Sequence, residues 1–181
     1  LHQADGNALV GRLVGRSSKI TSVKYSPDGK SLAVLGGAPA LFGEVQLWDV
    51  AQKQLRLSTT ISFDTLFGAS FSDDSTQLGF GSFDNKARVL NVADGKIIMS
   101  MDAHSDLVFD TTFSLKNDHL ISVSRDMSMK LTEIKTAQFI DNITSITPCS
   151  LNECLMAVQR HPKEEQVLIG GADGEPKLYK I

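Results

Sequence analysis

The chain of 181 residues carries 18 basic and 21 acidic side chains, which gives a formal net charge of −3. Because surfaces that bind nucleic acid or anionic membranes usually carry a basic excess, this balance predicts neither kind of partner. No apolar run approaches the roughly 18 residues of a membrane span, and the composition is that of a globular protein.

The first elements in chain order are three short runs of β-forming residues, separated by turns. Residues 20–29, ITSVKYSPDG, predict a strand that ends in a Ser-Pro-Asp-Gly turn. Residues 32–37, LAVLGG, predict a strand of small residues. Residues 44–50, EVQLWDV, predict a third strand that holds Trp48, the only tryptophan of the sequence.

These three phrases recur along the chain in constant order. The third-strand phrase returns after 42, another 42 and then 47 residues, at residues 87–92, 129–134 and 176–181. The first phrase returns at residues 66–74, 108–114 and 155–162, and the small-residue strand returns at residues 78–83, 120–125 and 167–172. An aspartate follows each of these last three strands at once: Asp84, Asp126 and Asp173. Self-similarity at such a period indicates a repeat architecture.

This pattern resembles a run of WD40 repeats, and the resemblance covers nearly the whole chain. It implies an all-β fold in which each repeat forms a four-stranded antiparallel blade of a β-propeller. Trp48 and Asp49 are the one intact signature dipeptide, since Leu90, Thr132 and Tyr179 hold the tryptophan position in the other repeats. We expect a single segment whose blades cover approximately residues 15–61, 62–103, 104–145 and 146–181.

The resemblance assigns structural roles to residues at the turns of the third repeat. Asp126 is expected to accept backbone N–H bonds in a tight turn and to hold His104, which lies where the family usually has Gly-His. Ser122 or Ser124 would complete this network. The fourth member of the family's network, the tryptophan, is Thr132 here, so the network is expected to be partial.

The other repeats keep fewer members of the same set. Asp84 and Asp173 are expected to hold the turn position in the second and fourth repeats. In the first repeat Arg16 replaces the histidine, and residues 38–43 are inserted where the aspartate should stand. Because no repeat carries the full set, we expect apolar packing to stabilise the blades more than polar contacts do.

The number of strands leaves the closure of the ring open. Residues 7–14 resemble an outermost strand, whereas Ile181 ends the chain on the third strand of the fourth repeat. Family members commonly close their ring when the N-terminal strand completes the last blade, and seven or eight blades are typical. Three assemblies stay possible: a segment of a longer propeller, two copies joined head to tail into an eight-bladed ring, or closure on four blades.

Residues 38–43 are the insertion that we expect to bind a partner. The connection between the second and third strands projects from one rim of a propeller, and Leu41 and Phe42 place two apolar side chains there. The alternative is that both fold back onto the neighbouring blade. Phe83 and Arg125 precede turn aspartates on the same rim, and Arg16 faces that side, either toward a partner or in a salt bridge between blades.

Residues that carry chemistry form no organised catalytic set. Cys149 and Cys154 lie in the longer link before the fourth repeat, where they either close a small disulfide or stay as free thiols. Two thiolates without a second pair of ligands make half a zinc site, so we expect no metal. No Ser-His-Asp set follows from the spacing, and no phosphate-binding loop or cofactor site is predicted.

The sequence therefore favours a non-catalytic scaffold that binds a protein or peptide and assembles as a homodimer or within a longer propeller. The alternative is an accessory segment of a larger, enzymatic polypeptide whose chemistry is encoded elsewhere. An enzyme that uses the propeller funnel would need convergent acid, base or metal groups at one rim, and the sequence shows none. The regular spacing and the Ser-Pro-Asp-Gly phrase also resemble bacterial WD40 segments.

Overall fold

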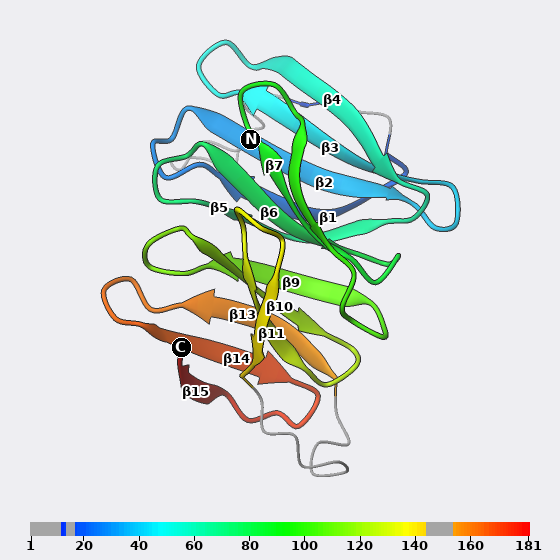
Figure 1. The fold of residues 1–181 in the computed structure, drawn as a ribbon. Coiled ribbons are helices and arrows are strands. Elements are labelled where there is room, and N and C mark those ends of the chain that lie inside the picture. Colours follow the sequence, from blue (N-terminus) through cyan, green and yellow to red (C-terminus); the bar gives the residue numbers. More distant parts are fainter. Residues whose placement is uncertain (1–11, 14–16, 144–153) are drawn as a thin grey trace.

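The computed structural model describes residues 12–13, 17–143 and 154–181. Within these ranges the chain is all β, and its strands form four antiparallel sheets that are stacked side by side in chain order (Figure 1). The first and last sheets lie at opposite ends of the stack. These sheets are blades of the propeller type, which confirms the predicted all-β class and its WD40-like blades.

Strands within each sheet follow the order of the chain. The first blade comprises β1 (Lys19–Tyr25), β2 (Ser31–Ala38), β3 (Phe42–Asp49) and β4 (Gln54–Ser62). The second comprises β5 (Leu66–Phe71), β6 (Gln77–Ser82), β7 (Ala87–Asn91) and β8 (Ile97–Met101). The third comprises β9 (Val108–Phe113), β10 (His119–Ser124), β11 (Met129–Glu133) and β12 (Phe139–Asn142). The fourth has three strands among the described residues: β13 (Leu155–Arg160), β14 (Gln166–Gly171) and β15 (Lys177–Lys180).

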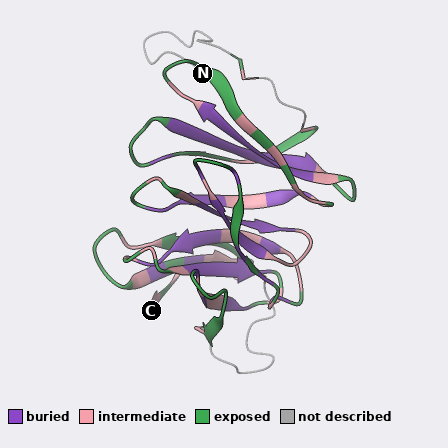
Figure 2. Cartoon of the chain, turned by 45° about the horizontal axis from the view of Figure 1, so that its top comes forward, coloured by how far each residue is buried: buried purple, intermediate pink, exposed green. Residues whose placement is uncertain are grey.

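Strand β2 of the first blade is buried on both faces of its sheet, to which its successive side chains point in turn. In β2 the side chains of Ala33 and Leu35 face the second blade, whereas Leu32 and Val34 belong to a cluster on the opposite face with Trp48. The small-residue strand is therefore buried almost throughout. Figure 2 shows buried residues mainly in the strands between blades, whereas most turns and parts of the end and outer strands are exposed.

Three apolar cores fill the spaces between successive blades. The core between the first and second blades is centred on Leu47, Leu66 and Phe80. Met99, Phe113 and Leu120 lie in the next core, and the last contains Ile121, Val158, Val167 and Ile169. At about 25 cal/mol per Å² of apolar surface, such packing is the main stabilising contribution to the fold.

Glycines of the second blade allow the backbones of neighbouring blades to approach closely. A Cβ placed on Gly81 would lie 2.3 Å from the carbonyl oxygen of Val108. Gly68 has a φ of +56°, and a Cβ there would lie 2.3 Å from the Cα of Asp110. Both positions therefore need glycine, Gly81 for space and Gly68 for space and backbone conformation.

Two features of the first blade differ from the expectation. The insertion 38–43 does not form a long loop, because β2 and β3 are eight residues each and pair as far as Ala38 and Phe42. Phe42 is thus a half-buried strand residue. Of the expected outer strand 7–14, Leu13 is described, and it packs against Leu32, Val34 and Trp48; the remaining residues lie outside the described ranges, apart from Arg12.

Replacement of Gly81 by alanine tests the close approach of the blades. We expect Gly81→Ala to lower the free energy of unfolding by about 1–3 kcal/mol, because the new methyl meets a backbone carbonyl that cannot move alone. Gly79→Ala on the same strand should cost less, since its nearest contact, at 2.6 Å, is the flexible tip of Leu120. Urea denaturation measures both, and an equal or reversed order would contradict the packing described here.

Candidate functional site

Two kinds of connection meet at one edge of the stack, which we name the aspartate rim. They are the turns between the second and third strands of each blade and the links from an outer strand to the next inner strand. The aspartate rim consists of residues 39–41, 63–65, 83–86, 102–107, 125–128 and 172–176. Leu41, Phe83 and Arg125 lie on this rim, and Phe42 directly adjoins it.

His104 and Asp126 lie together at the third blade's part of the aspartate rim. Nδ1 of His104 is 2.9 Å from Oδ2 of Asp126, and Nε2 is 2.8 Å from the hydroxyl of Ser122. The backbone N–H groups of Ser105 and Ser128 donate to the same carboxylate at 3.0 and 2.9 Å. The structure thus brings together the residues expected from the repeat pattern, with Ser122 rather than Ser124 on the histidine.

The charge of Asp126 is stabilised within this network. Burial by itself would raise the pKa of the carboxyl, but the hydrogen bonds from His104 and Ser128, the electrostatic attraction of His104 and the Ser105 N–H hold the pKa well below its usual range. The hydroxyl of Thr132, at the tryptophan position, contacts the sulfur of Met101 instead. Asp126 therefore has a structural environment, with its oxygens occupied by neighbours.

The second and fourth blades supply a cation from the third strand instead of a histidine. Arg88 forms two hydrogen bonds with Asp84, at 2.9 and 2.5 Å, in a pair whose side chains are nearly buried. Lys177 pairs with Asp173 in the same i, i+4 relation. Burial raises the pKa of Asp84, but the hydrogen bond and charge of Arg88 outweigh it, so the net shift is downward.

The first blade uses a third arrangement. Nε1 of Trp48 donates to Gln46 at 3.1 Å, and Gln46 donates in turn to Glu44 at 2.9 Å. Asp49 is not part of this chain; its carboxylate accepts the N–H of Gln52 in the turn at the opposite edge. The aspartate missing from the β2–β3 turn is replaced by Asp64, which accepts the N–H of Ala40 at 3.2 Å.

Apolar side chains gather on the aspartate rim. Leu41 is 74% exposed and Phe63, in the adjoining β4–β5 link, is 67% exposed. Phe83 stacks on Phe67 with ring centroids 4.3 Å apart, and Phe109 meets both rings edge-on at 6.2 and 6.3 Å. Exposed apolar residues beside a partly buried aromatic cluster are a composition typical of binding surfaces.

The remaining residues of the expected site are placed as follows. Arg125 is 60% exposed and its Nε lies 3.5 Å from Asp106, which is a surface pair. Arg16 and Cys149 lie outside the described residues, so the partner role of Arg16 and the disulfide remain predictions. Cys154 is half-buried immediately before β13, and its carbonyl accepts the N–H of Ala172.

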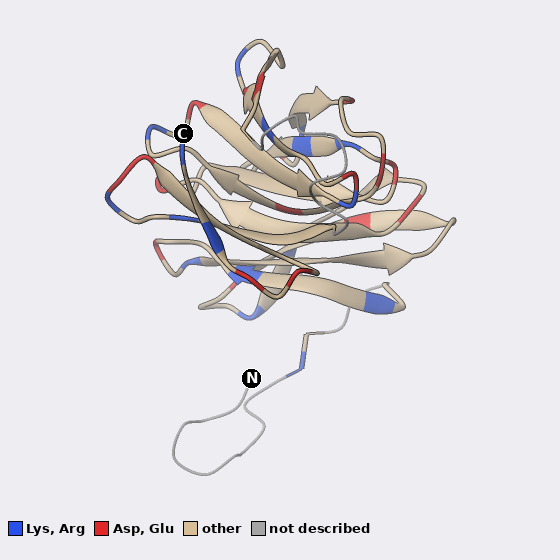
Figure 3. Cartoon of the chain, turned by 90° about the horizontal axis from the view of Figure 1, so that it is seen from below, with Lys and Arg blue, Asp and Glu red and all other residues tan. Residues whose placement is uncertain are grey.

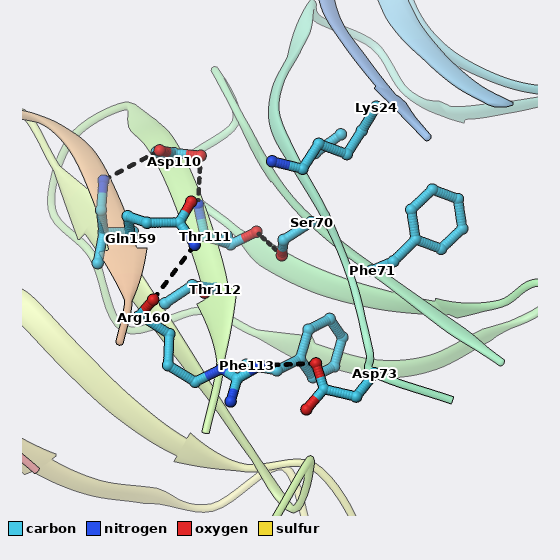
Figure 4. Close-up of a pocket in the computed structure, with 12 residues that line it drawn as sticks. Lys24, Ser70, Phe71, Asp73, Asp110, Thr111, Thr112, Phe113, Gln159 and Arg160 are labelled. Carbon is cyan, nitrogen blue, oxygen red and sulfur yellow. Dashed lines mark hydrogen bonds and ion pairs between the residues drawn. The ribbon is translucent and has the colours of Figure 1, made fainter. Parts of the chain in front are cut away.

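A polar pocket lies between the inner strands of the four blades, β1, β5, β9 and β13 (Figure 4). Its volume is about 160 Å³, and the side chains that line it include Lys24, Ser70, Thr111, Gln159 and Arg160. Arg160 of the fourth blade pairs across the pocket with Asp73 of the second blade at 2.6 Å. The lining is balanced in charge and is largely engaged in contacts between blades.

Asp110 is a half-buried acid of this pocket. Its carboxylate accepts the N–H of Val158 on β13 at 3.0 Å and the N–H of Thr111 at 2.9 Å. Burial raises the pKa of Asp110, more than these hydrogen bonds and the charge of Lys24 lower it. The group joins two blades, and no histidine lines the pocket beside it.

The described ranges show neither a concentration of charge nor a cluster of metal ligands. Basic and acidic side chains are interspersed, mostly on the turns (Figure 3), without a surface of a single sign. Among the described residues no three His, Cys, Asp or Glu side chains are close enough to share a metal ion. The same part of the chain has no helix of the length and apolarity needed to cross a membrane.

The repeat geometry agrees with a match to a family model. Residues 95–132, from the β7–β8 turn through the His104–Asp126 network to β11, match the model described as WD domain, G-beta repeat. These residues match one WD40 repeat of the four that the structure contains as blades. This confirms the family expected from the repeated phrases.

Curated relatives match the chain at low identity. The chain is 27% identical over 165 residues to eukaryotic translation initiation factor 3 subunit I of Eremothecium gossypii, covering 84% of this chain and 46% of that protein. It is 26% identical over 189 residues to telomerase protein component 1 of Rattus norvegicus, covering 98% of this chain and 7% of that protein. A WD repeat-containing protein of Synechocystis is 26% identical over 141 residues, covering 77% and 39%. The chain thus spans less than half of each of these relatives, and its expected bacterial character stays a prediction.

Solved structures share the fold. The WD40 repeats of RRP9 superpose with a TM-score of 0.81 at 18% identity, covering 93% of this chain and 50% of that one. The computationally designed Ika4 protein gives a TM-score of 0.76 at 22% identity, covering 94% and 96%. These likenesses show the architecture alone.

The sequence pattern did not reveal several residues on or beside the aspartate rim. Phe67 and Phe109 occupy the same position in two repeats, directly after the first residue of the inner strand, and this shared position was a signal for a cluster. Phe63 aligns with Ser105 at the 42-residue period, so the pattern gave no sign of an apolar residue there. Asp64 aligns with Asp106, but the period gave no sign of its contact with the β2–β3 turn. Their proximity to the β2–β3 turn is a consequence of the three-dimensional packing.

The His104–Asp126 pair predicts a specific dependence of stability on pH. Because the pKa of Asp126 is lower in the folded state than the usual value of about 3.9, its stabilising contribution is complete above that value and is lost as the pH falls below it. We expect Asp126→Asn to destabilise the protein by about 2–3 kcal/mol at pH 7, with the gap to wild type closing as the pH falls from about 5 to 2. Asp102→Asn, at an exposed carboxyl paired with Lys86 on the surface, should leave the profile unchanged. A constant gap across this pH range would contradict the role of the charge.

Proposed function

We propose that the chain is a non-catalytic scaffold that binds a protein or peptide at the aspartate rim and works as one half of an eight-bladed ring. The observation that supports the ring is that the first and fourth blades expose complementary apolar faces. WD40-repeat relatives support the general role of a protein-interaction scaffold. The homodimer and the lack of catalysis are our inference.

The first blade exposes a face that is buried in the second blade. Ile20, Val23 and Tyr25 of β1 are 51%, 56% and 49% exposed. Residues at the same repeat positions in the second blade, Leu66, Ala69 and Phe71, are at most 9% exposed because they pack on the first blade. The face is therefore shaped for a preceding blade.

The fourth blade exposes the complementary face. Leu168 and Leu178 are paired across β14 and β15 and are 46% and 61% exposed. Their counterparts in the third blade, Ile121 and Leu131, lie in the core against the fourth blade. A following blade would bury this face in the same way.

Leu13 occupies the place of an outer strand from a preceding blade. Met101 at the end of β8 packs in the core with Leu120 and Ile134 of the following blade. Leu13 packs on Leu32 and Val50, the residues at the same positions in the first blade. Leu13 thus lies at the position of a fourth strand that would complete a preceding blade, while the last sheet has three strands among the described residues.

A second copy supplies both missing parts. Its β13–β15 sheet fits the free face of the first blade, and the segment around Leu13 would complete that sheet. Ika4, a chain of matching length, supports a four-blade unit, whereas RRP9 supports the alternative of a longer propeller, because this chain matches half of it. Closure on four blades is disfavoured because both end faces remain exposed.

The proposal of a non-catalytic role rests on the engagement of the acids and the histidine. Asp84, Asp126 and Asp173 each hold a cation or imidazole and a turn, and His104 is bonded on both nitrogens. The polar atoms of these side chains are engaged in structural contacts within the blades. The alternative, an accessory segment of a larger enzymatic polypeptide, uses the same blades and differs in the sequence that flanks them.

The first prediction concerns the mass in solution. Light scattering across a dilution series should give about twice the chain mass of 19.6 kDa. Leu168→Lys/Leu178→Lys should shift the species to the monomer, because lysines on the joining face cannot be buried without a partner. Ile98→Lys, on the exposed outer strand β8, should leave the mass unchanged. A wild-type monomer at all concentrations would contradict the homodimer.

The second prediction concerns the aspartate rim. Peptides selected from a displayed random library against the wild-type protein should lose at least about tenfold in affinity for Leu41→Ser/Phe63→Ser, because exposed apolar anchors carry most of the binding free energy. Ile140→Ser, an exposed apolar residue on outer strand β12, is the matched control. Equal affinity for all three proteins, measured by fluorescence polarisation, would place the binding surface elsewhere.

A further inference from the structure

Side-chain hydrogen bonds join the inner strands of neighbouring blades at the first junction. The hydroxyl of Ser22 on β1 accepts the backbone N–H of Ala69 on β5 at 3.0 Å. The hydroxyl of Thr21 donates to the carbonyl oxygen of Leu66. Both bonds link one blade to the next through a side chain and a backbone group, so they fix the position of the second inner strand against the first.

The other two internal junctions are joined by side-chain hydrogen bonds at the same or adjacent positions of the inner strand. Between the second and third blades, the hydroxyl of Thr111 donates to the carbonyl of Gly68 at 2.9 Å and lies 3.1 Å from the hydroxyl of Ser70. Between the third and fourth blades, Asp110 accepts the N–H of Val158 at 3.0 Å. Each internal junction is thus held by at least one side-chain hydrogen bond between inner strands.

The repeat register places apolar residues at these positions at the two free ends. Met156 and Ala157 of β13 stand where the first blade has Thr21 and Ser22. Val23 of β1 stands where the third blade has Thr111. None of the three side chains carries a hydrogen-bonding oxygen or nitrogen, and Met156 and Val23 are 52% and 56% exposed.

The turns at the opposite edge show the same contrast. The N–H of Asp28 donates to the hydroxyl of Ser75 in the next blade at 3.2 Å, and the N–H of Asp73 donates to Asn117 in the blade after that at 3.1 Å. Gly29 holds the position of Ser75 and Asn117 in the first blade. A preceding blade therefore finds no side-chain acceptor there.

We propose that a second copy of this chain docks β1 against β13 through an apolar seam, formed by Val23 of one copy with Met156 and Ala157 of the other. This inference rests on the proposed ring and adds the chemistry of its joints. Hydrogen bonds join blades within each chain, whereas apolar contact alone joins the inner strands of the two chains. The seam is accordingly the joint at which the ring opens, and the two halves exchange between rings.

Apolar matching also explains why the occupant is a copy of this chain. The internal junctions pair a polar side chain on one strand with a backbone group on the next, so exposed polar groups would be expected on an end built for a partner of that kind. Here Val23, Met156 and Ala157 are apolar at these positions, and burial of Val23 against Met156 leaves no polar atom of these side chains unpaired. Gln159 holds the position of Ser70, and its amide donates to the carbonyl oxygen of Arg160 in its own chain. Each end is therefore complementary to the other end of an identical chain.

Site-directed disulfides test the contact. In a background with Cys149→Ser and Cys154→Ser, chains that carry Val23→Cys are mixed with chains that carry Ala157→Cys and are oxidised. The mixture should give a covalent dimer that a thiol reductant separates, whereas each chain alone should not. Ser22→Cys/Ala69→Cys, the equivalent pair inside one chain, is the positive control and should form an intrachain bond.

A hydrogen bond added at the seam tests its chemistry. Ala157→Ser supplies the hydroxyl that Ser22 supplies at the first junction, so the dissociation constant of the dimer should fall about fivefold for each of the two seams, about 25-fold in total. Ala51→Ser, at an exposed turn residue far from the inner strands, makes the same atomic change and should have no effect.

The outcomes separate this inference from the ring itself. Cross-linking of the mixed chains together with tighter association of Ala157→Ser supports the apolar seam. A wild-type dimer that neither cross-links at these positions nor responds to Ala157→Ser would overturn the seam and leave the ring standing. A wild-type chain that stays monomeric at every concentration would overturn the ring, and the seam with it.

Discussion

Burial of two apolar faces by every sheet is the constraint on which this structure depends. A sheet with one apolar face can stand against solvent, but a propeller blade needs a neighbour on each side. Three cores between blades satisfy this need inside the chain, and they leave one unsatisfied face at each end of the stack. The two end faces of the stack therefore stay exposed to solvent within a single chain. Any account of assembly and function has to say what covers them.

Polar groups have a secondary but position-specific part in the fold. The turn aspartates are held in three different ways, by His104 in the third blade, by Arg88 in the second and by Lys177 in the fourth. The position is thus kept while its partner changes, which is possible because any nearby cation or imidazole stabilises a buried carboxylate. Packing determines the blade, and the polar contacts determine the shape of each turn.

The repeat pattern was sufficient to predict the blades, their order and the His104–Asp126 network, because each depends on residues at fixed spacing. It could not predict that residues 38–43 would lengthen β2 and β3, since an inserted segment has no counterpart in the other repeats. Nor could it predict the role of Asp64 at the β2–β3 turn. Contacts between a link and a turn of neighbouring elements arise from packing, and no period in the sequence encodes them.

The last strand, β15, has a neighbour on one side among the described residues, so its other edge presents unpaired backbone N–H and C=O groups. Such an edge can template the addition of further strands and lead to aggregation. β15 reads Lys177-Leu-Tyr-Lys180, with a lysine at each end of a short apolar centre. Lysines at an edge oppose the approach of an identical strand, because like charges would meet in register. The two lysines thus protect this edge against self-propagating growth.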